Sequence, residues 1–165
     1  MLTYALKNIR EEGVSLIVSA LIVDDDPEVR RMLSSILEDE GYSVEAVDNG
    51  REAIRTCERL PFDVALVDIN LPDVKGTELL RELKRLQPKM VKIIITGHPS
   101  FENAMEALNE KSDGFISKPF DPQELLAMIK KLIAEKQNDY LQMLKEVEDA
   151  QKNNPFVKYQ NPSGW

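Results

Sequence analysis

The stretch SALIVDDDPEVRRML, residues 19–33, joins an apolar run to three consecutive aspartates. The run has the length of a strand, and the residues after the aspartates have helical spacing, so the stretch predicts a buried strand that leads into a helix. Like charges at the end of a buried strand repel one another and are costly to desolvate unless positive charge neutralises them. The stretch therefore predicts both a strand–helix unit and a site for a cation or another positive group.

Short apolar segments alternate with amphipathic segments through the middle of the chain. The segments of strand length are ALIVD, SVEAV, DVALVD, KIIIT and GFIS, and residues 20–23 and 64–67 are apolar throughout. Continuous apolar strands are typical of a parallel sheet that helices cover on both faces. Residues 19–135 are therefore expected to form an α/β fold of five strand–helix repeats.

Residues that begin and end helices stand at the boundaries of the amphipathic segments. Asp26 can cap the first predicted helix, with Pro27 at its first position, and Gly41 follows its end. Ser100 and Asp121 can cap two later helices. These residues support the predicted boundaries.

The composition is that of an ordinary globular protein, with 42% hydrophobic and 30% charged residues. A formal net charge of -8 argues against broad binding to nucleic acid or to an anionic membrane. The longest apolar run, residues 14–23, is too short to span a membrane. Glu11 and Glu12 precede it where a signal peptide needs basic residues. We therefore expect a cytoplasmic protein.

The chain divides into three expected parts. Residues 1–18 form an N-terminal extension without an evident role, residues 19–135 form the domain, and residues 136–165 form a helical extension and a C-terminal tail. Apolar residues of the last helix and its extension fit the a and d positions of heptads, with Lys136 as a break: Leu126, Ile129, Ile133, Tyr140, Met143, Val147 and Ala150. Two interpretations stay open, a homodimer through this helix and a helix that folds back on its own domain.

Polar residues follow the ends of several predicted strands. Asp24 and Asp25 follow the first, Asp68 ends the third, Thr96 ends the fourth and Lys118 follows the fifth. In an open parallel sheet, ligands bind beyond the carboxyl ends of the strands. Carboxylates without histidine or thiolate suit Mg²⁺. An ammonium and a hydroxyl beside them suit a phosphoryl group.

Four motifs occur in order, LIVDDDP, VALVDINLPDVKG, IIITGH and FISKPF, and with them residues 19–135 resemble the receiver domains of two-component response regulators. The resemblance implies a flavodoxin-like, doubly wound sheet of five parallel strands in the order 2-1-3-4-5 with helices on both faces. It implies a phosphorelay protein that accepts a phosphoryl group from a histidine kinase or a phosphotransfer protein. Such a protein is a switch for a downstream protein partner and not an enzyme. No DNA-binding motif follows the domain, so we expect a stand-alone receiver.

The resemblance also assigns roles to residues of the acidic site. Asp68 is implied to be the phospho-acceptor. Asp25, Asp68 and the backbone carbonyl of Asn70 are implied to hold Mg²⁺, with Asp24 acting through water. Asn70 and His98 occupy the positions that tune dephosphorylation in the family.

Further roles concern phosphate binding and the response to it. Thr96 and Lys118 are implied to contact the phosphoryl group, and a cis bond at Pro119 to aim the lysine inward. Phe115 occupies the position of the aromatic residue that turns inward with the threonine. The implied output surface is the fourth strand, the fourth helix and the fifth strand, which includes Phe101, Met105 and Ile116.

One departure from the family and two alternatives remain. Lys111 and Ser112 replace the usual Gly-Ala, and a left-handed residue other than glycine at a helix end costs roughly 1 kcal/mol. Either the turn differs here or the helix before it is less firmly terminated. One alternative function is a phosphate-independent scaffold. The other is an Mg²⁺-dependent phosphohydrolase with an aspartyl nucleophile, which Asp24 and Asp26 imitate, although Glu28 departs from its motif.

Overall fold

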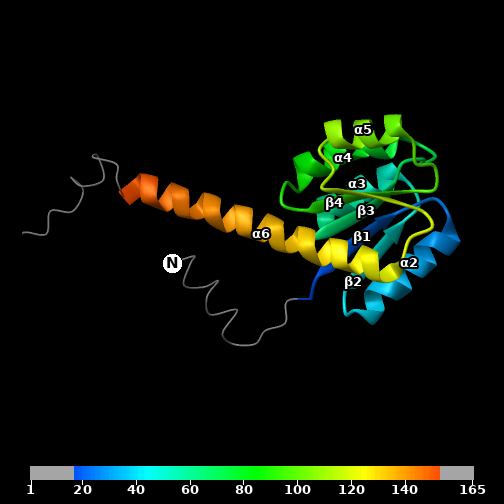
Figure 1. The fold of residues 1–165 in the computed structure, drawn as a ribbon, viewed down its shortest axis with the longest axis horizontal. Helices are drawn as coiled ribbons and strands as arrows, with labels where there is room; N and C mark the ends of the chain where they lie inside the picture. Colours follow the sequence, from blue (N-terminus) through cyan, green and yellow to red (C-terminus); the bar gives the residue numbers. More distant parts are fainter. Residues whose placement is uncertain (1–16, 153–165) are drawn as a thin grey trace, which may run out of the picture.

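The computed structural model describes residues 17–152, which form an open α/β sandwich (Figure 1). The elements in chain order are β1 (Ser19–Val23), α2 (Pro27–Asp39), β2 (Ser43–Val47), α3 (Gly50–Arg59), β3 (Val64–Asp68), α4 (Gly76–Leu86), β4 (Val91–Thr96), α5 (Phe101–Asn109), β5 (Gly114–Ser117) and α6 (Pro122–Lys152). The strands pair in the order β2-β1-β3-β4-β5 and every pair is parallel. The predicted fold and strand order are confirmed.

Two apolar layers lie on opposite faces of the sheet. On one face α3, α4 and α5 contribute Ala53, Leu80 and Ala107 to a cluster with Val67. On the other face α2 and α6 contribute Leu33 and other side chains. Every residue of β3 and β4 is buried, whereas β2 at the edge is largely exposed. The continuous apolar strands of the sequence are thus those covered on both faces.

The predicted caps begin their helices. The Asp26 side chain accepts a hydrogen bond from the Glu28 amide at 2.8 Å, and the Ser100 hydroxyl accepts one from the Asn103 amide at 3.0 Å. Gly41, after α2, has a φ of 84°, a conformation that glycine adopts without steric cost. These boundaries follow from local chemistry that the sequence carries.

The turn after α5, where Lys111 and Ser112 replace the usual Gly-Ala, keeps its left-handed conformation. Lys111 follows α5 with a φ of 59°, so the left-handed turn is kept by a residue other than glycine. The Lys111 amide donates to the Leu108 carbonyl at 3.0 Å, and the Ser112 amide donates to Ala107 at 2.9 Å. The turn is therefore formed, and it carries the steric cost of a Cβ atom in this region.

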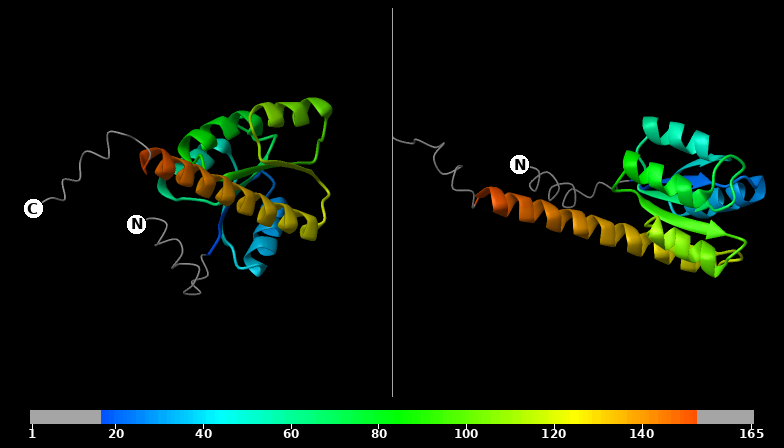
Figure 2. Two further views of the ribbon diagram at one scale, coloured as in Figure 1. Left: turned by 60° about the vertical axis from the view of Figure 1, so that its left-hand side comes forward. Right: turned by 90° about the horizontal axis from the view of Figure 1, so that it is seen from above.

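α6 continues far beyond the sheet as a single helix, as the two views of Figure 2 show. Its first part belongs to the domain, since Leu126 and Ile129 are 4% and 0% exposed in the core. The expected boundary at residue 135 lies inside this helix. Within residues 17–152, none of the helices combines the length and apolar character needed to cross a bilayer.

Two contacts fix the middle of α6 to the domain. Lys136 donates to Asp113 at 2.8 Å, and the Lys89 ammonium lies 3.5 Å from the centre of the Tyr140 ring. Because Leu126 and Ile129 are buried in their own domain, the start of the predicted heptad seam is closed to a second chain. The N-terminal extension up to residue 16 and the tail from residue 153 lie outside the described residues.

Candidate functional site

The parallel topology brings the polar strand ends to one edge of the sheet. Asp24 directly follows β1, Asp68 is the last residue of β3, and Thr96 is the last residue of β4. The pairing of β1 with β3 and of β3 with β4 places these three ends side by side. Lys118 follows β5, and its amide donates to the Thr96 carbonyl at 2.7 Å.

Three carboxylates form an acidic cluster at this edge. Asp24, Asp25 and Asp68 can each offer an oxygen atom such that these atoms lie within 4.8 Å of one another. Asp24 is 2% and Asp68 8% exposed, whereas Asp25 is open to solvent. Within residues 17–152 no other group of three acidic, histidine or cysteine residues meets this geometry. Asp26 stands outside the cluster because its carboxylate caps α2.

Lys118 places a positive charge against this cluster. Its ammonium donates to Asp24 Oδ2 at 2.7 Å and lies 3.7 Å from Asp68 Oδ1. The peptide bond between Lys118 and Pro119 is cis. The lysine thus neutralises part of the charge of two nearly buried carboxylates.

Several hydrogen bonds fix the backbone around Asp24, and one of them, from Arg30, was not predicted from the sequence. The Arg30 guanidinium donates to the Asp24 carbonyl at 2.7 Å, and the Asp26 amide donates to Asp24 Oδ1 at 2.9 Å. The Asp24 amide also donates to Val47 in β2 at 3.2 Å. A basic residue one turn into the helix after the aspartates was the available signal for Arg30.

The loop after Asp68 is closed on itself. The Gly76 amide donates to the Ile69 carbonyl at 2.7 Å, and Asn70 and Lys75 form an isolated antiparallel bridge. A Cβ atom on Gly76 would stand 2.1 Å from the Asp68 carbonyl oxygen, so glycine is required by close backbone approach. The loop therefore holds the Asp68 backbone in one position.

The charge balance of the cluster favours a further cation. Burial raises the pKa of Asp68 above its ordinary value, the neighbouring carboxylates of Asp24 and Asp25 raise it further, and Lys118 opposes this by lowering it. One ammonium faces three carboxylates. A hard divalent ion with oxygen ligands would relieve the remaining repulsion, so the donor set fits Mg²⁺.

The other predicted site residues surround the cluster. Thr96 is fully buried, and its hydroxyl oxygen accepts a hydrogen bond from the His98 amide at 3.1 Å. The side chains of Asn70 and His98 are exposed. Phe115 is partly buried against the same apolar cluster as α4. The strand ends therefore bring Thr96 near Lys118, while Asn70 and His98 lie on flanking loops.

Comparison with known proteins identifies the class. Residues 20–130 match the model of the response regulator receiver domain, and the chain belongs to this family. The transcriptional regulatory protein GlrR of Escherichia coli K12 is 35% identical over 109 residues, which cover 66% of this chain and 24% of that protein. The curated relatives are longer: the chain spans from about a quarter to half of their length.

Solved structures show the same fold. A CheY-like receiver domain protein from Methanospirillum hungatei JF-1 is 41% identical with a TM-score of 0.73, over 75% of this chain and 99% of that one. The beryllofluoride-activated NtrC4 receiver domain dimer is 35% identical with a TM-score of 0.68, over 72% of this chain and 98% of that one. The acidic cluster thus corresponds to the acidic phospho-acceptor site of receiver domains in two-component signalling.

Proposed function

We propose that this chain is a phosphorelay response regulator in which Asp68 accepts a phosphoryl group from a histidine kinase or a phosphotransfer protein. The observation that carries the proposal is the position of the Lys118 ammonium, 2.7 Å from Asp24 and 3.7 Å from Asp68 within a cluster of three carboxylates. Such a cluster accepts a dianionic group only when positive charge is already present. We take residues 19–135 as the receiver domain and place it in the cytoplasm.

In the proposed transfer, a carboxylate oxygen of Asp68 attacks the phosphorus atom. The bond between phosphorus and the donor nitrogen breaks, and the donor imidazole keeps the electron pair. Lys118 pairs with the incoming phosphoryl oxygens, and the Thr96 hydroxyl donates a hydrogen bond to them. The protein contributes mainly position and charge, as phosphoryl transfer requires.

Asp25, Asp68 and the backbone carbonyl of Asn70 would hold Mg²⁺, with Asp24 contributing through water. When bound, the ion supplies positive charge to the phosphoryl oxygens. The support for this ligand set is the oxygen chemistry of the cluster and the closed loop that fixes Asn70. Asn70 and His98, both exposed beside the cluster, are proposed to control the access of the water that hydrolyses the acyl phosphate.

The proposed output surface consists of β4, α5 and β5, with a downstream protein as its partner. Thr96 would move toward the phosphoryl group and Phe115 would turn further inward behind it. The surface already exposes apolar side chains, since Met105 is 41% and Leu108 63% exposed. The Phe101 side chain lies outside the described part of α5. Neither nucleic acid nor a membrane is proposed as a partner, because the chain carries a net charge of -8.

Incubation with acetyl phosphate and Mg²⁺, followed by mass spectrometry of the intact chain, tests the acceptor. We expect one phosphoryl increment on the wild type, its loss in Asp68→Asn, and its retention in the matched control Asp26→Asn, since Asp26 caps a helix outside the cluster. Labelling that survives in Asp68→Asn would contradict the proposal. A wild-type chain without labelling would favour a phosphate-independent scaffold, and repeated turnover of a phospho-substrate would favour a hydrolase.

We also propose that the chain forms a homodimer through the distal part of α6. Met143 and Val147 are 50% and 48% exposed there, and the related NtrC4 receiver domain is described as a dimer. Light scattering with and without beryllofluoride measures the mass. We expect a dimer that Val147→Asp dissociates, while Lys145→Ala leaves it unchanged; a monomer under both conditions would contradict it.

A further inference from the structure

The described side chains of α5 attach it to the domain mainly by polar contacts. Among its described side chains Ala107 alone is buried, while Met105 and Leu108 are exposed. Apolar burial is the main force that fixes a helix on a sheet, and the described side chains of α5 supply little of it. Its position must depend on other interactions.

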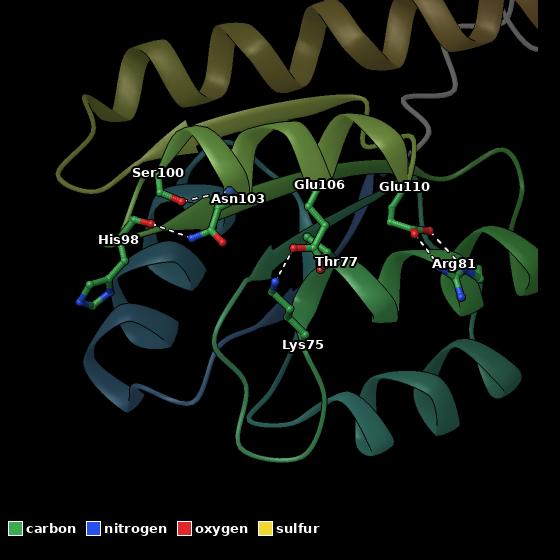
Figure 3. A network of polar contacts seen from close by, with 8 residues as sticks. All are labelled: Lys75, Thr77, Arg81, His98, Ser100, Asn103, Glu106 and Glu110. Carbon is green, nitrogen blue, oxygen red and sulfur yellow. Dashed lines mark hydrogen bonds and ion pairs between the residues drawn. The ribbon is translucent and has the colours of Figure 1, made fainter.

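Charged and polar residues join α5 to the start and middle of α4 (Figure 3). Glu106 accepts from the Thr77 hydroxyl at 2.8 Å and from the Lys75 ammonium. Glu110 accepts from Arg81 through two nitrogens, Nε at 3.1 Å and Nη2 at 2.5 Å. We call these five residues, Lys75, Thr77, Arg81, Glu106 and Glu110, the α4–α5 clasp.

The start of α4, which carries Lys75 and Thr77, is firmly held and adjoins the acidic site. Thr77 is fully buried, and Lys75 is held by its backbone bridge to Asn70. The Gly76 amide between them is bonded to the Ile69 carbonyl, next to Asp68. The Lys75 backbone and the Thr77 side chain are therefore firmly held, so we expect a rearrangement of the clasp to come from α5.

The other end of α5 is connected to Thr96. The Asn103 side chain donates to the His98 carbonyl at 3.0 Å, and the His98 amide donates to the Thr96 hydroxyl oxygen at 3.1 Å. These two hydrogen bonds give a route by which a movement of the Thr96 hydroxyl would reach His98 and, through Asn103, the first turn of α5. α5 is thus linked to the site at its first turn and restrained by the clasp along its length.

We propose that the α4–α5 clasp holds α5 in its resting position and opens when a phosphoryl group binds at Asp68, so that the clasp sets how readily the chain switches. The second half of this statement rests on the proposed function. Glu106 and Glu110 are positioning residues in this scheme. An exposed ion pair changes an equilibrium by about two- to fivefold, so two pairs favour the resting form by about tenfold.

Hydrogen exchange of the unphosphorylated chain tests the restraint itself. In Glu106→Gln/Glu110→Gln we expect the α5 amides to exchange about tenfold faster, with the α4 amides unchanged. Glu82→Gln is the matched control, because Glu82 pairs with Arg85 within α4 and not with α5. Equal α5 exchange in the wild type and the double variant would overturn the proposal.

A charge exchange separates the ion pair from the shape of the side chains. Arg81→Glu alone places two negative charges together and is expected to speed α5 exchange, whereas Arg81→Glu/Glu110→Arg is expected to bring it back within about twofold of the wild type. A combined variant as fast as the single one would contradict a role for the pair.

Beryllofluoride titration in the presence of Mg²⁺, followed by the ¹⁹F signal of the bound species, tests the link to switching. Glu106→Gln/Glu110→Gln is expected to reach half-saturation at about tenfold lower beryllofluoride concentration, because binding then requires less free energy to open the clasp. Faster α5 exchange with an unchanged half-saturation point would overturn the link. If the wild type binds no beryllofluoride, the proposed function fails and with it the link to switching, while the exchange result alone decides the restraint.

Discussion

α4 and α5 are adjacent helices on the same face of the sheet, and different forces hold them. α4 buries Leu79, Leu80 and Leu83, whereas the described side chains of α5 include one that is buried, Ala107. α4 also has basic residues in its last turn, which favour the negative end of the helix dipole, and α5 has none there. Two helices of similar length thus differ greatly in how much apolar surface their described side chains bury.

The difference has a consequence for a switch. Burying one leucine stabilises by about 1.5–3 kcal/mol, while an exposed ion pair contributes about 0–1 kcal/mol. Displacing α4, which begins directly after the Asp68 loop, would therefore require a large free energy. Displacing α5, which is linked to Thr96 through the His98 backbone, would require less. The chain therefore combines a firmly held loop after Asp68 with a neighbouring helix that buries fewer of its described side chains.

The largest effect in this comparison is expected from truncating an apolar side chain of α4. Leu80→Ala removes a fully buried side chain and should lower the free energy of unfolding by about 3 kcal/mol. Leu108→Ala in α5, at 63% exposed, is the matched control and should change it by less than about 0.5 kcal/mol. Urea denaturation measures both, and similar losses would remove the distinction between the two helices.

A smaller effect is expected at the end of α5. Lys111 has a φ of 59°, so Lys111→Gly should raise the free energy of unfolding by about 0.5–1 kcal/mol by removing the Cβ clash. Lys111→Ala keeps a Cβ atom and should give no such gain. Thermal and urea unfolding measure the stability of the two variants. An equal rise in the free energy of unfolding of Lys111→Gly and Lys111→Ala would assign the effect to loss of the lysine charge instead.

The smallest effect is expected from pH. Hydrogen bonds from Lys75 and then Thr77 lower the pKa of Glu106 below its ordinary value, and partial burial opposes this. A lowered folded-state pKa means that the contacts of Glu106 contribute fully above the ordinary pKa of a glutamate and lose their contribution as pH falls through the folded value.

Protection of the α5 amides, corrected for intrinsic exchange rates, should therefore fall about two- to fivefold more than that of the α4 amides on acidification. Glu106→Gln is the control and should lose most of this difference. An acid response of α5 that is the same in Glu106→Gln would assign the effect to another group.

Much of the fold was predictable because its signals are local. The apolar runs gave the five strands, and Asp26 and Ser100 gave two helix starts that their side-chain hydrogen bonds confirm. The members of the acidic cluster were also predictable, since parallel strands bring their ends to one edge. Arg30 was missed, because its bond to the Asp24 carbonyl depends on the path of the chain between them.

The clasp could not be predicted from the sequence. Lys75 and Glu106 are 31 residues apart, and Arg81 and Glu110 are 29 apart, among many charged residues with no pattern that pairs them. The same holds for the helix after residue 121, whose apolar stripe left open a dimer seam or packing on its own domain. The structure buries Leu126 and Ile129 of this stripe in the core. Charged side chains and helix faces have several possible partners until the elements are packed.

The sequence by itself determined the order of strands and helices, the edge where the site lies and the residue types gathered there, because periodicity and capping act over a few residues. The tertiary structure decided that Lys118 faces Asp24 more closely than Asp68, that Gly76 must lack a side chain, and that α5 is held by ion pairs. Each of these depends on distances between elements far apart in the chain. Such distances are set by how the whole core packs and not by any local pattern.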